Sequence, residues 1–293
     1  MGERWIRVTK RDVCPMCGRP DWCMLSPDRA VCLCMRSESA WSAKQGGWYH
    51  KLTADMPKPI PPPRTRPTWI SGEGQEIDFA SIMRDYRMKT DDLTLHRHAM
   101  TLGVTADSLR FLGAAWAGPY RAWAFPMLDA QAKVVGIRLR SEKGDKWAVT
   151  GSHQGLFVPA VPLTEPVVIC EGPTDTAAAI SLGFFAIGRP SCNSCVDMVV
   201  ELMRKKDVVI MGDRDQPKER PNGTIFLPGQ EGAKALALAL FEGRARSVKI
   251  IYPLRGKDAR AWLRAGATRG HVLAAIKQKS RWQPSGAVGN SPR

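Results

Sequence analysis

After Pro166 the sequence alternates short apolar runs with stretches of helical pattern, and this alternation constrains the fold more than any other feature. The runs "VVIC", "FFAI", "VVIM" and "VKII" are separated by segments such as "TDTAAAISLG" and "GAKALALALF". Near-continuous apolar strands are typical of a sheet that is covered on both faces, and strand–helix alternation is typical of a parallel sheet. We therefore predict an α/β domain over residues 163–275, with a parallel sheet and helices on both of its faces.

Acidic residues stand where three of these predicted strands end. The run "VVIC" leads into Glu171, "VVIM" leads into Asp213 and Asp215, and "KIIYPLRGK" leads into Asp258. Ligands of open parallel sheets bind at the carboxyl ends of the strands. The two side chains of an extended Asp-x-Asp segment point the same way, because side-chain direction repeats every two residues.

Carboxylate oxygens in such an arrangement suit a hard divalent cation, because Mg²⁺ prefers oxygen ligands and completes its shell with waters and substrate phosphates. Each acidic motif alone is also what a polar surface loop would carry. Their conjunction, in this order along a parallel α/β pattern, favours a shared Mg²⁺ site built from Glu171, Asp213 and Asp215.

The net charge indicates a polyanionic partner. The chain has 43 Lys and Arg residues against 28 Asp and Glu residues, which gives a formal net charge of +15. Proteins this basic commonly bind nucleic acid. No apolar run approaches the roughly 20 residues of a membrane-spanning helix, and the start "MGERWIRVTKRDVC" lacks the apolar region of a secretory signal. We expect a cytoplasmic protein with no membrane partner.

Five of the eight cysteines fall within the first 34 residues, at positions 14, 17, 23, 32 and 34. In a cytoplasmic protein such a cluster is better explained by metal binding than by disulfides. The "CPMCG" knuckle and the three cysteines after it predict a tetrahedral Zn²⁺ site. Zinc would allow a module of about 50 residues to fold, and a purely structural role is the alternative to a role in nucleic-acid contact.

The turn of the predicted hairpin selects the zinc ligands. A turn at Pro27-Asp28 would place Cys23 and Cys32 directly opposite each other. On this basis we expect the zinc ligands to be Cys14, Cys17, Cys23 and Cys32, with Cys34 as the substitute if Cys23 packs inward. The later pair Cys192 and Cys195 has metal-like spacing but no partner pair, and we interpret it as a loop and helix start.

Proline marks the boundary between two modules. Residues 55–75 contain prolines at positions 57, 59, 61, 62, 63 and 67, which favour a stiff, extended linker. We predict a zinc-binding ribbon at 1–52, a linker at 53–75, an α+β subdomain at 76–162, the parallel-sheet domain at 163–275 and a loose tail at 276–293.

Basic residues follow strands in the α+β subdomain. Residues 121–160 alternate in polarity and contain turn signals, which predicts antiparallel strands. Arg138 and Arg140 would share one face of the strand "VVGIRLR", and Lys146 follows a turn. Together with Lys257, they are candidates for binding template phosphates or an incoming triphosphate. A solvated strand face is the alternative interpretation of any one of them.

The segments "ICEGPTDTAAAISLG", "VVIMGDRD", "GQEGAKALALAL" and "YPLRGKDARAWLRAG" resemble the TOPRIM domain, which is shared by bacterial and phage primases, topoisomerases and some nucleases and recombination proteins. The resemblance covers residues 164–268. It places the motif glutamate of that family on Glu171 and its Asp-x-Asp on Asp213 and Asp215. Asp175 matches an acid often seen in primases. The stretch "QPKERPNGTIFLP" departs from the family pattern and is expected to be a surface insertion.

The rest of the chain resembles primases as well. The knuckle "CPMCG" is similar to the zinc ribbon that precedes phage- and plasmid-type primase domains, and residues 121–160 are similar to the region ahead of TOPRIM in bacterial-type primases. The resemblance implies a DNA-directed RNA polymerase of the primase class, a nucleotidyltransferase that acts on single-stranded DNA and ribonucleoside triphosphates in a bacterial cell, encoded either by the host or by a phage or plasmid. It implies structural Zn²⁺ and catalytic Mg²⁺, with Mn²⁺ as the alternative ion and Asp175 and Asp258 as helpers.

Three alternatives follow from the same resemblance. A TOPRIM topoisomerase needs a nucleophilic tyrosine in a large additional domain, which this chain is too short to hold. A TOPRIM nuclease of the overcoming-lysogenisation type would carry an ATPase, and no G-x-x-x-x-G-K-[ST] motif is present. A non-catalytic zinc and TOPRIM protein resembling a recombination mediator is the remaining alternative. Without an ATPase motif, a primase of this kind would work with a separate replicative helicase.

Overall fold

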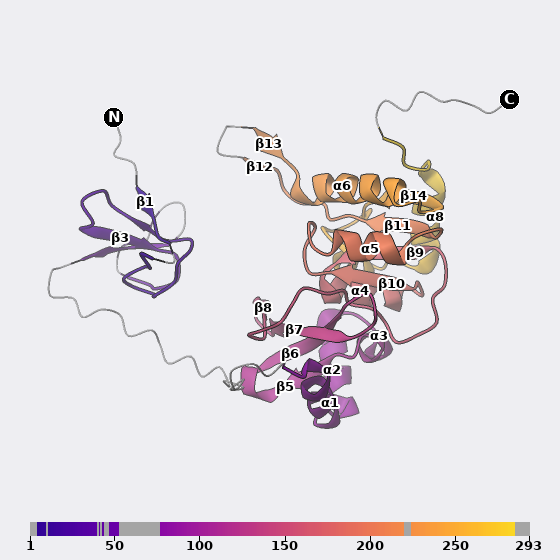
Figure 1. Cartoon of the computed structure of the whole chain (residues 1–293), viewed down its shortest axis with the longest axis horizontal. Helices are drawn as coiled ribbons and strands as arrows, with labels where there is room; N and C mark the ends of the chain where they lie inside the picture. Colours follow the sequence, from indigo (N-terminus) through magenta and orange to yellow (C-terminus); the bar gives the residue numbers. More distant parts are fainter. Residues whose placement is uncertain are drawn as a thin grey trace. The chain divides into compact units, whose positions relative to one another are not determined.

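The computed structural model describes residues 5–9, 11–39, 41, 43, 47–52, 77–219 and 224–284. The chain divides into two compact units, Met1–Trp69 and Ile70–Arg293 (Figure 1). The predicted linker at 53–75 lies outside the described residues, as do the tail residues 285–293. Among the described residues, no helix has the length and apolar character needed to cross a membrane.

The first unit contains a four-stranded antiparallel sheet in the order β1-β2-β3-β4. Its strands are β1 (Ile6–Arg7), β2 (Met24–Leu25), β3 (Val31–Cys34) and β4 (Trp48–Lys51). Its small core consists of Val8, Leu25 and four buried cysteines. So few apolar side chains cannot stabilise a unit of this size alone, which is why such modules commonly depend on a bound metal.

The second unit begins with an α+β subdomain. Its helices are α1 (Phe79–Met88), α2 (Asp92–Leu102) and α3 (Ala106–Phe111), and its antiparallel sheet has the order β5-β6-β7-β8, with strands β5 (Ala115–Ala117), β6 (Ala122–Leu128), β7 (Val134–Ser141) and β8 (Lys146–Ala148). Alternate side chains of β6 point to opposite faces. Ala122 and Ala124 therefore pack with α1, whereas Trp123 and Phe125 pack with α2 and α3.

The rest of the second unit is a four-stranded parallel sheet in the order β10-β9-β11-β14. Its strands are β9 (Val167–Glu171), β10 (Ala186–Arg189), β11 (Asp207–Met211) and β14 (Ser247–Ile251), and its helices are α4 (Gly172–Ser181), α5 (Val196–Leu202), α6 (Pro228–Glu242), α7 (Ala259–Arg264) and α8 (Arg269–Gln278).

Helices cover both faces of this sheet, as predicted. Val168 and Val209 belong to a core shared with α4, α7 and α8, whereas Ile169 and Ile210 belong to a core shared with α5 and α6. Strands that are buried on both sides read as continuous apolar runs, which is the pattern seen in the sequence.

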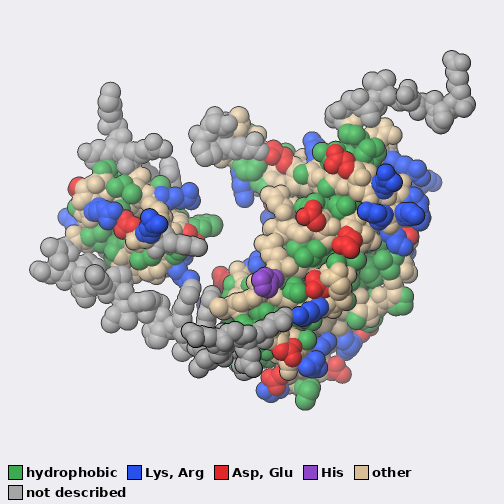
Figure 2. All heavy atoms as spheres, in the orientation of Figure 1, with side chains coloured by type: hydrophobic (Ala, Val, Ile, Leu, Met, Phe, Trp, Pro, Cys, Tyr) green, Lys and Arg blue, Asp and Glu red, His purple; other side chains and the backbone are tan. Residues whose placement is uncertain are grey.

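The stretch between β11 and α6 forms a hairpin of two short strands, β12 (Lys218–Glu219) and β13 (Ile225–Phe226), which projects from the second unit in Figure 1. Figure 2 shows Lys and Arg side chains gathered at another part of that unit, where α8 and β14 lie in Figure 1. The excess of positive charge is therefore unevenly spread over the visible face.

Candidate active site

The parallel sheet places the predicted acids at its topological switch point. From β9 the chain first crosses to β10 on one side and then to β11 on the other, so the crevice lies between β9 and β11. Ile169 is level with Ile210, and two residues further along these strands Glu171 comes level with Gly212. Glu171 and Asp213 therefore flank the crevice in which α/β sheets bind ligands.

Backbone contacts hold the Asp-x-Asp segment against the start of α6. The Gly229 N–H donates to Asp215 Oδ2 at 3.0 Å, so the positive end of the helix dipole faces the carboxylate. A Cβ atom at Gly229 would lie 2.8 Å from the Asp213 carbonyl oxygen, which explains a glycine at this position. On the other side, Lys257 Nζ lies 3.0 Å from Asp215 Oδ1.

The remaining two predicted acids are fixed by helix α7. Asp258 is its N-cap, and its Oδ1 accepts from the Ala261 N–H at 2.7 Å. Asp175, in α4, accepts from the Arg260 N–H at 3.1 Å. Both carboxylates thus have a structural partner, and the charge of each adds to the effect of burial in raising the pKa of Asp213.

Burial and mutual closeness raise the pKa values of three of these carboxylates. Burial, followed by the charges of Asp175, Glu171 and Asp258, raises the pKa of Asp213 from 3.8 to about 8. Burial and the charge of Asp258 raise the pKa of Asp175 to about 7. Burial also raises the pKa of Glu171, with Asp215 contributing in the same direction. The carboxyl groups therefore lie close enough together to oppose one another's ionisation, although Lys257 pairs with Asp215.

These carboxylates do not form a closed cage. Among the described residues, only a cysteine cluster in the first unit has three or more ligand atoms that all lie within 4.8 Å of one another. The wider spacing of the acids suits Mg²⁺, which retains waters and substrate phosphates and rarely takes all its ligands from protein. The mutual repulsion of the carboxylates and the all-oxygen donor set both fit such an ion.

Basic side chains of β7 and β8 lie beside the acids. Arg140 Nη1 donates to Thr174 Oγ1 at 3.2 Å, which links β7 to the first turn of α4. Partial desolvation and the positive charge of Arg140 lower the pKa of Lys146. Arg138 and Arg140 occupy alternate positions on β7, as predicted, and Arg140 pairs across the sheet with Lys146. Lys257 approaches the acids from the other side, through its contact with Asp215.

Arg189 belongs to the site but was not predicted from the sequence. Arg189 ends β10 directly beside Glu171, is 2% exposed, and its Nε has no hydrogen-bond partner. Burial lowers the pKa of Arg189 while Glu171 opposes that shift. In the sequence, Arg189 is recognisable only as a basic residue at the end of the apolar run "FFAIG". The strand order is what places it next to Glu171.

In the first unit, four sulfur atoms lie within 4.8 Å of one another, and they belong to Cys14, Cys17, Cys23 and Cys34. The predicted set is corrected at one position, because Cys34 takes the place of Cys32. Met24 pairs with Leu33, and this register brings Cys23 opposite Cys34. The chain reverses one residue later than predicted, with Arg29 in the left-handed region at φ 57°.

The sulfur cluster fits zinc. Backbone N–H groups of Met35 and Ser37 donate to the sulfurs of Cys23 and Cys34 at 3.4 and 3.2 Å. Burial opposes ionisation of Cys34, yet N–H donors of its loop lower its pKa to about 7. Cys32 lies outside the group of four, with its sulfur 3.5 Å from that of Cys14. Four thiolate donors at this spacing are typical of a structural zinc site.

Fold and acids together define an α/β domain with acidic residues at one strand edge, in a chain that also carries a cluster of four cysteines. No protein-family model matches the chain, and no curated protein matches it by sequence. Solved structures do match. The E. coli primase catalytic core aligns with 69% of this chain and 79% of its own length, at 14% identity and a TM-score of 0.51.

Two further structures give the same result. The DnaG primase catalytic domain bound to single-stranded DNA aligns over 69% of this chain and 77% of its own, at 13% identity and a TM-score of 0.52. The zinc-binding and RNA polymerase domains of Aquifex aeolicus primase align over 69% of this chain and 60% of their own, at 14% identity and a TM-score of 0.53. The chain therefore has the fold of a bacterial primase catalytic core, and the predicted TOPRIM-type sheet is confirmed.

Proposed function

We propose that the protein is a DNA primase, which synthesises short RNA primers on single-stranded DNA by Mg²⁺-dependent nucleotidyl transfer. The observation that carries the proposal is the gathering of Glu171, Asp213 and Asp215 at the switch point of the parallel sheet, where burial and neighbouring carboxylates raise the pKa of Asp213. The fold shared with primase cores, including one bound to single-stranded DNA, supports the same conclusion.

In this proposal the 3′-hydroxyl oxygen of one nucleotide attacks the α-phosphorus of the next. The bond from that phosphorus to the bridging oxygen breaks, pyrophosphate leaves, and the hydroxyl proton passes to solvent. Glu171, Asp213 and Asp215 hold Mg²⁺, with Mn²⁺ as the alternative ion. When bound, the ion stabilises the attacking and leaving oxygens.

The other residues of the site position these groups. Asp175 links α4 to the start of α7 and Asp258 caps α7, and both influence the titration of Asp213. Arg138, Arg140 and Lys146 receive the phosphates of the template or of the incoming triphosphate, because guanidinium groups bind phosphate through paired hydrogen bonds. Lys257 holds Asp215 in place through its 3.0 Å contact.

The zinc ribbon contacts the template or the first nucleotide in this proposal, with Cys14, Cys17, Cys23 and Cys34 as the ligands of a structural Zn²⁺. We further propose that a replicative helicase is the partner that supplies strand separation.

The test is templated incorporation of labelled ribonucleotides on single-stranded DNA by the full chain. Asp213→Asn should abolish synthesis, whereas Asp197→Asn, an exposed position in the first turn of α5, should leave it unchanged. Equal synthesis by the Asp213 variant and the wild type rejects the proposal. DNA binding by a ring-shaped oligomer without any incorporation favours the recombination-mediator alternative, and metal-dependent degradation of the DNA favours a TOPRIM nuclease.

A further inference from the structure

A cavity of about 740 Å³ lies in the second unit, bordered by α2, by the sheet strands β5 to β7 and by α7. It is separate from the carboxylates of the candidate active site, none of which lines it. The volume falls within the range of roughly 300–1,000 Å³ that is usual for small-molecule sites.

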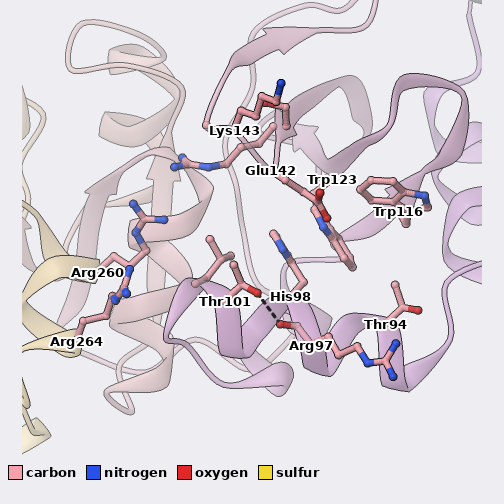
Figure 3. A pocket seen from close by; sticks show the side chains of 14 residues that line it. Thr94, Arg97, His98, Thr101, Trp116, Trp123, Glu142, Lys143, Arg260 and Arg264 are labelled. Carbon is pink, nitrogen blue, oxygen red and sulfur yellow. Dashed lines mark hydrogen bonds between the residues drawn. The ribbon is translucent and has the colours of Figure 1, made fainter.

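The two sides of this cavity differ in chemistry. In Figure 3, Trp116 and Trp123 lie on one side, and Arg260 and Arg264 extend from α7 on the other. Trp123 is buried and meets the half-buried Trp116 edge to face, with ring centroids 5.7 Å apart. An aromatic wall facing guanidinium groups suits a ligand with a flat ring at one end and negative charge at the other.

The cationic side is not neutralised by the protein. Arg140 and Lys143 also line the cavity, and Glu142 is the one acid among its lining residues. Within the described part of the chain, Arg140, Lys143, Arg260 and Arg264 form no ion pair within 4.0 Å. Gly103, at the end of α2, leaves room for the stem of Arg264, because a Cβ there would lie 2.6 Å from it.

A buried polar atom points to a ligand as well. His98 lines the cavity and is 8% exposed, and its Nε2 has no hydrogen-bond partner. Its ring stacks on Trp123, with centroids 4.0 Å apart and planes 6° apart. Figure 3 shows the side chain rising from α2 between Thr101 and Trp123. Burial, with the nearby charges of Arg140 and Arg260, lowers the pKa of His98 to about 3, so the imidazole is neutral.

We propose that this cavity binds a nucleoside triphosphate, with its base against Trp116 and within reach of His98, and its phosphates among Lys143, Arg260 and Arg264. Stacking on an indole accepts any base, and the neutral imidazole forms one hydrogen bond to the base or ribose. A buried polar atom left without a partner is costly, and such a ligand removes that cost.

This inference rests on the proposed primase function in one respect, which is the role of the ligand. Synthesis that starts without a primer needs two nucleotides, and the first of them keeps its triphosphate. Arg140 and Arg260 connect the cavity to the acids, through Thr174 and through the main-chain N–H that binds Asp175. We therefore assign the cavity to the initiating nucleotide.

Binding is measured by calorimetry of the full chain with GTP and with ATP, without DNA and without added divalent metal. Arg264→Ala should weaken binding at least about tenfold, since it removes a charged phosphate contact, and Trp116→Ala at least about fivefold. The matched control Arg84→Ala changes an exposed arginine of α1 outside the cavity and should bind as the wild type does. Equal affinities in all variants overturn the proposal.

His98→Phe separates a ligand role from a structural one. Phenylalanine can keep the stack on Trp123, and no internal hydrogen bond of Nε2 is lost. The variant should therefore melt at or above the wild-type temperature, yet bind nucleotide more weakly. A lower melting temperature with unchanged nucleotide affinity would show a structural histidine and overturn this contact. Weaker binding of single-stranded DNA with unchanged nucleotide affinity would instead assign the cavity to the template.

The role in initiation has its own readout. Arg264→Ala should reduce primer synthesis from free nucleotides at least about tenfold, and should leave extension of a pre-annealed oligoribonucleotide within about twofold of wild type. Equal loss in both reactions overturns the initiating role. If the wild type performs neither reaction, the proposed primase function fails, while the calorimetric result on the cavity still holds.

Discussion

Neutralising Asp213 should stabilise the metal-free protein at high pH. The folded state raises the pKa of Asp213 from 3.8 to about 8, through burial first and then through neighbouring carboxylates. Between these two values the folded protein holds a proton that the unfolded chain has lost. Stability contributed by this proton is therefore fully present below about pH 3.8 and is lost progressively as the pH rises through about 8.

The size of the effect follows from the shift. A rise of about 4 in pKa corresponds to about 5 kcal/mol at about 1.36 kcal/mol per pKa unit. Asp213 is partly accessible to water, which screens the charge, so we expect about 2–3 kcal/mol. Asp213→Asn should gain that amount at pH 9 and little at pH 5. For a unit of this size the gain corresponds to a rise in melting temperature of about 5–10 °C.

The assay is thermal and urea unfolding followed by helical circular dichroism, because all the described α-helices belong to the second unit. Buffers are freed of magnesium without a chelator, which would also remove zinc. Adding Mg²⁺ should stabilise the wild type by about 2.7 kcal/mol at 100 times its dissociation constant, and the variant much less. Asp197→Asn is the control. The reasoning is refuted if Asp213→Asn is no more stable than wild type at pH 9.

Three further predictions concern other residues. Arg189→Met should move the acidic limb of the pH–rate profile to higher pH, because the positive charge of Arg189 lowers the pKa of Glu171 in the wild type. An unmoved limb would contradict this. The variant should lose little stability, because burying an incompletely paired guanidinium is itself costly. Cys34→Ser should lose zinc, measured by elemental mass spectrometry, whereas Cys32→Ser should keep it; the opposite result would restore the predicted ligand set. Gly229→Ala should lower the free energy of unfolding by about 1–3 kcal/mol and weaken magnesium-dependent stabilisation, and wild-type behaviour in both measurements would show that the close approach of α6 is unimportant.

The sequence predicted what depends on local pattern. Continuous apolar runs such as the one ending at Glu171 identify strands buried on both faces, and acids at the ends of parallel strands must meet at one edge. The turn of the ribbon hairpin lies one residue later than predicted, because Arg29 adopts a left-handed conformation that ordinarily favours glycine. A shift of one residue in the turn changes the cross-strand partner of Cys23 by two residues, from Cys32 to Cys34.

What depends on long-range packing could not be predicted. Arg189 is adjacent to Glu171 only because β10 pairs with β9 and not with β11. The cavity joins His98, Trp116 and Arg264, residues that no local pattern connects, and its aromatic wall reads in the sequence as ordinary core residues of a strand and a helix.

The acidic strand edge and the basic cavity lie close together, yet in the described part of the chain their side chains of opposite sign do not form ion pairs with each other. Arg140 and Arg260 lie near the carboxyl groups of Asp175 and Asp213, whose pKa values are raised by burial, yet these side chains form no ion pair within 4.0 Å in the described residues. If the arrangement served stability alone, direct ion pairs would be expected, because separated buried charges cost more than paired ones. Keeping them apart leaves the cations free for phosphate and the carboxylates free for metal. On the proposed function, a nucleotide with its metal ion would supply both missing partners at once.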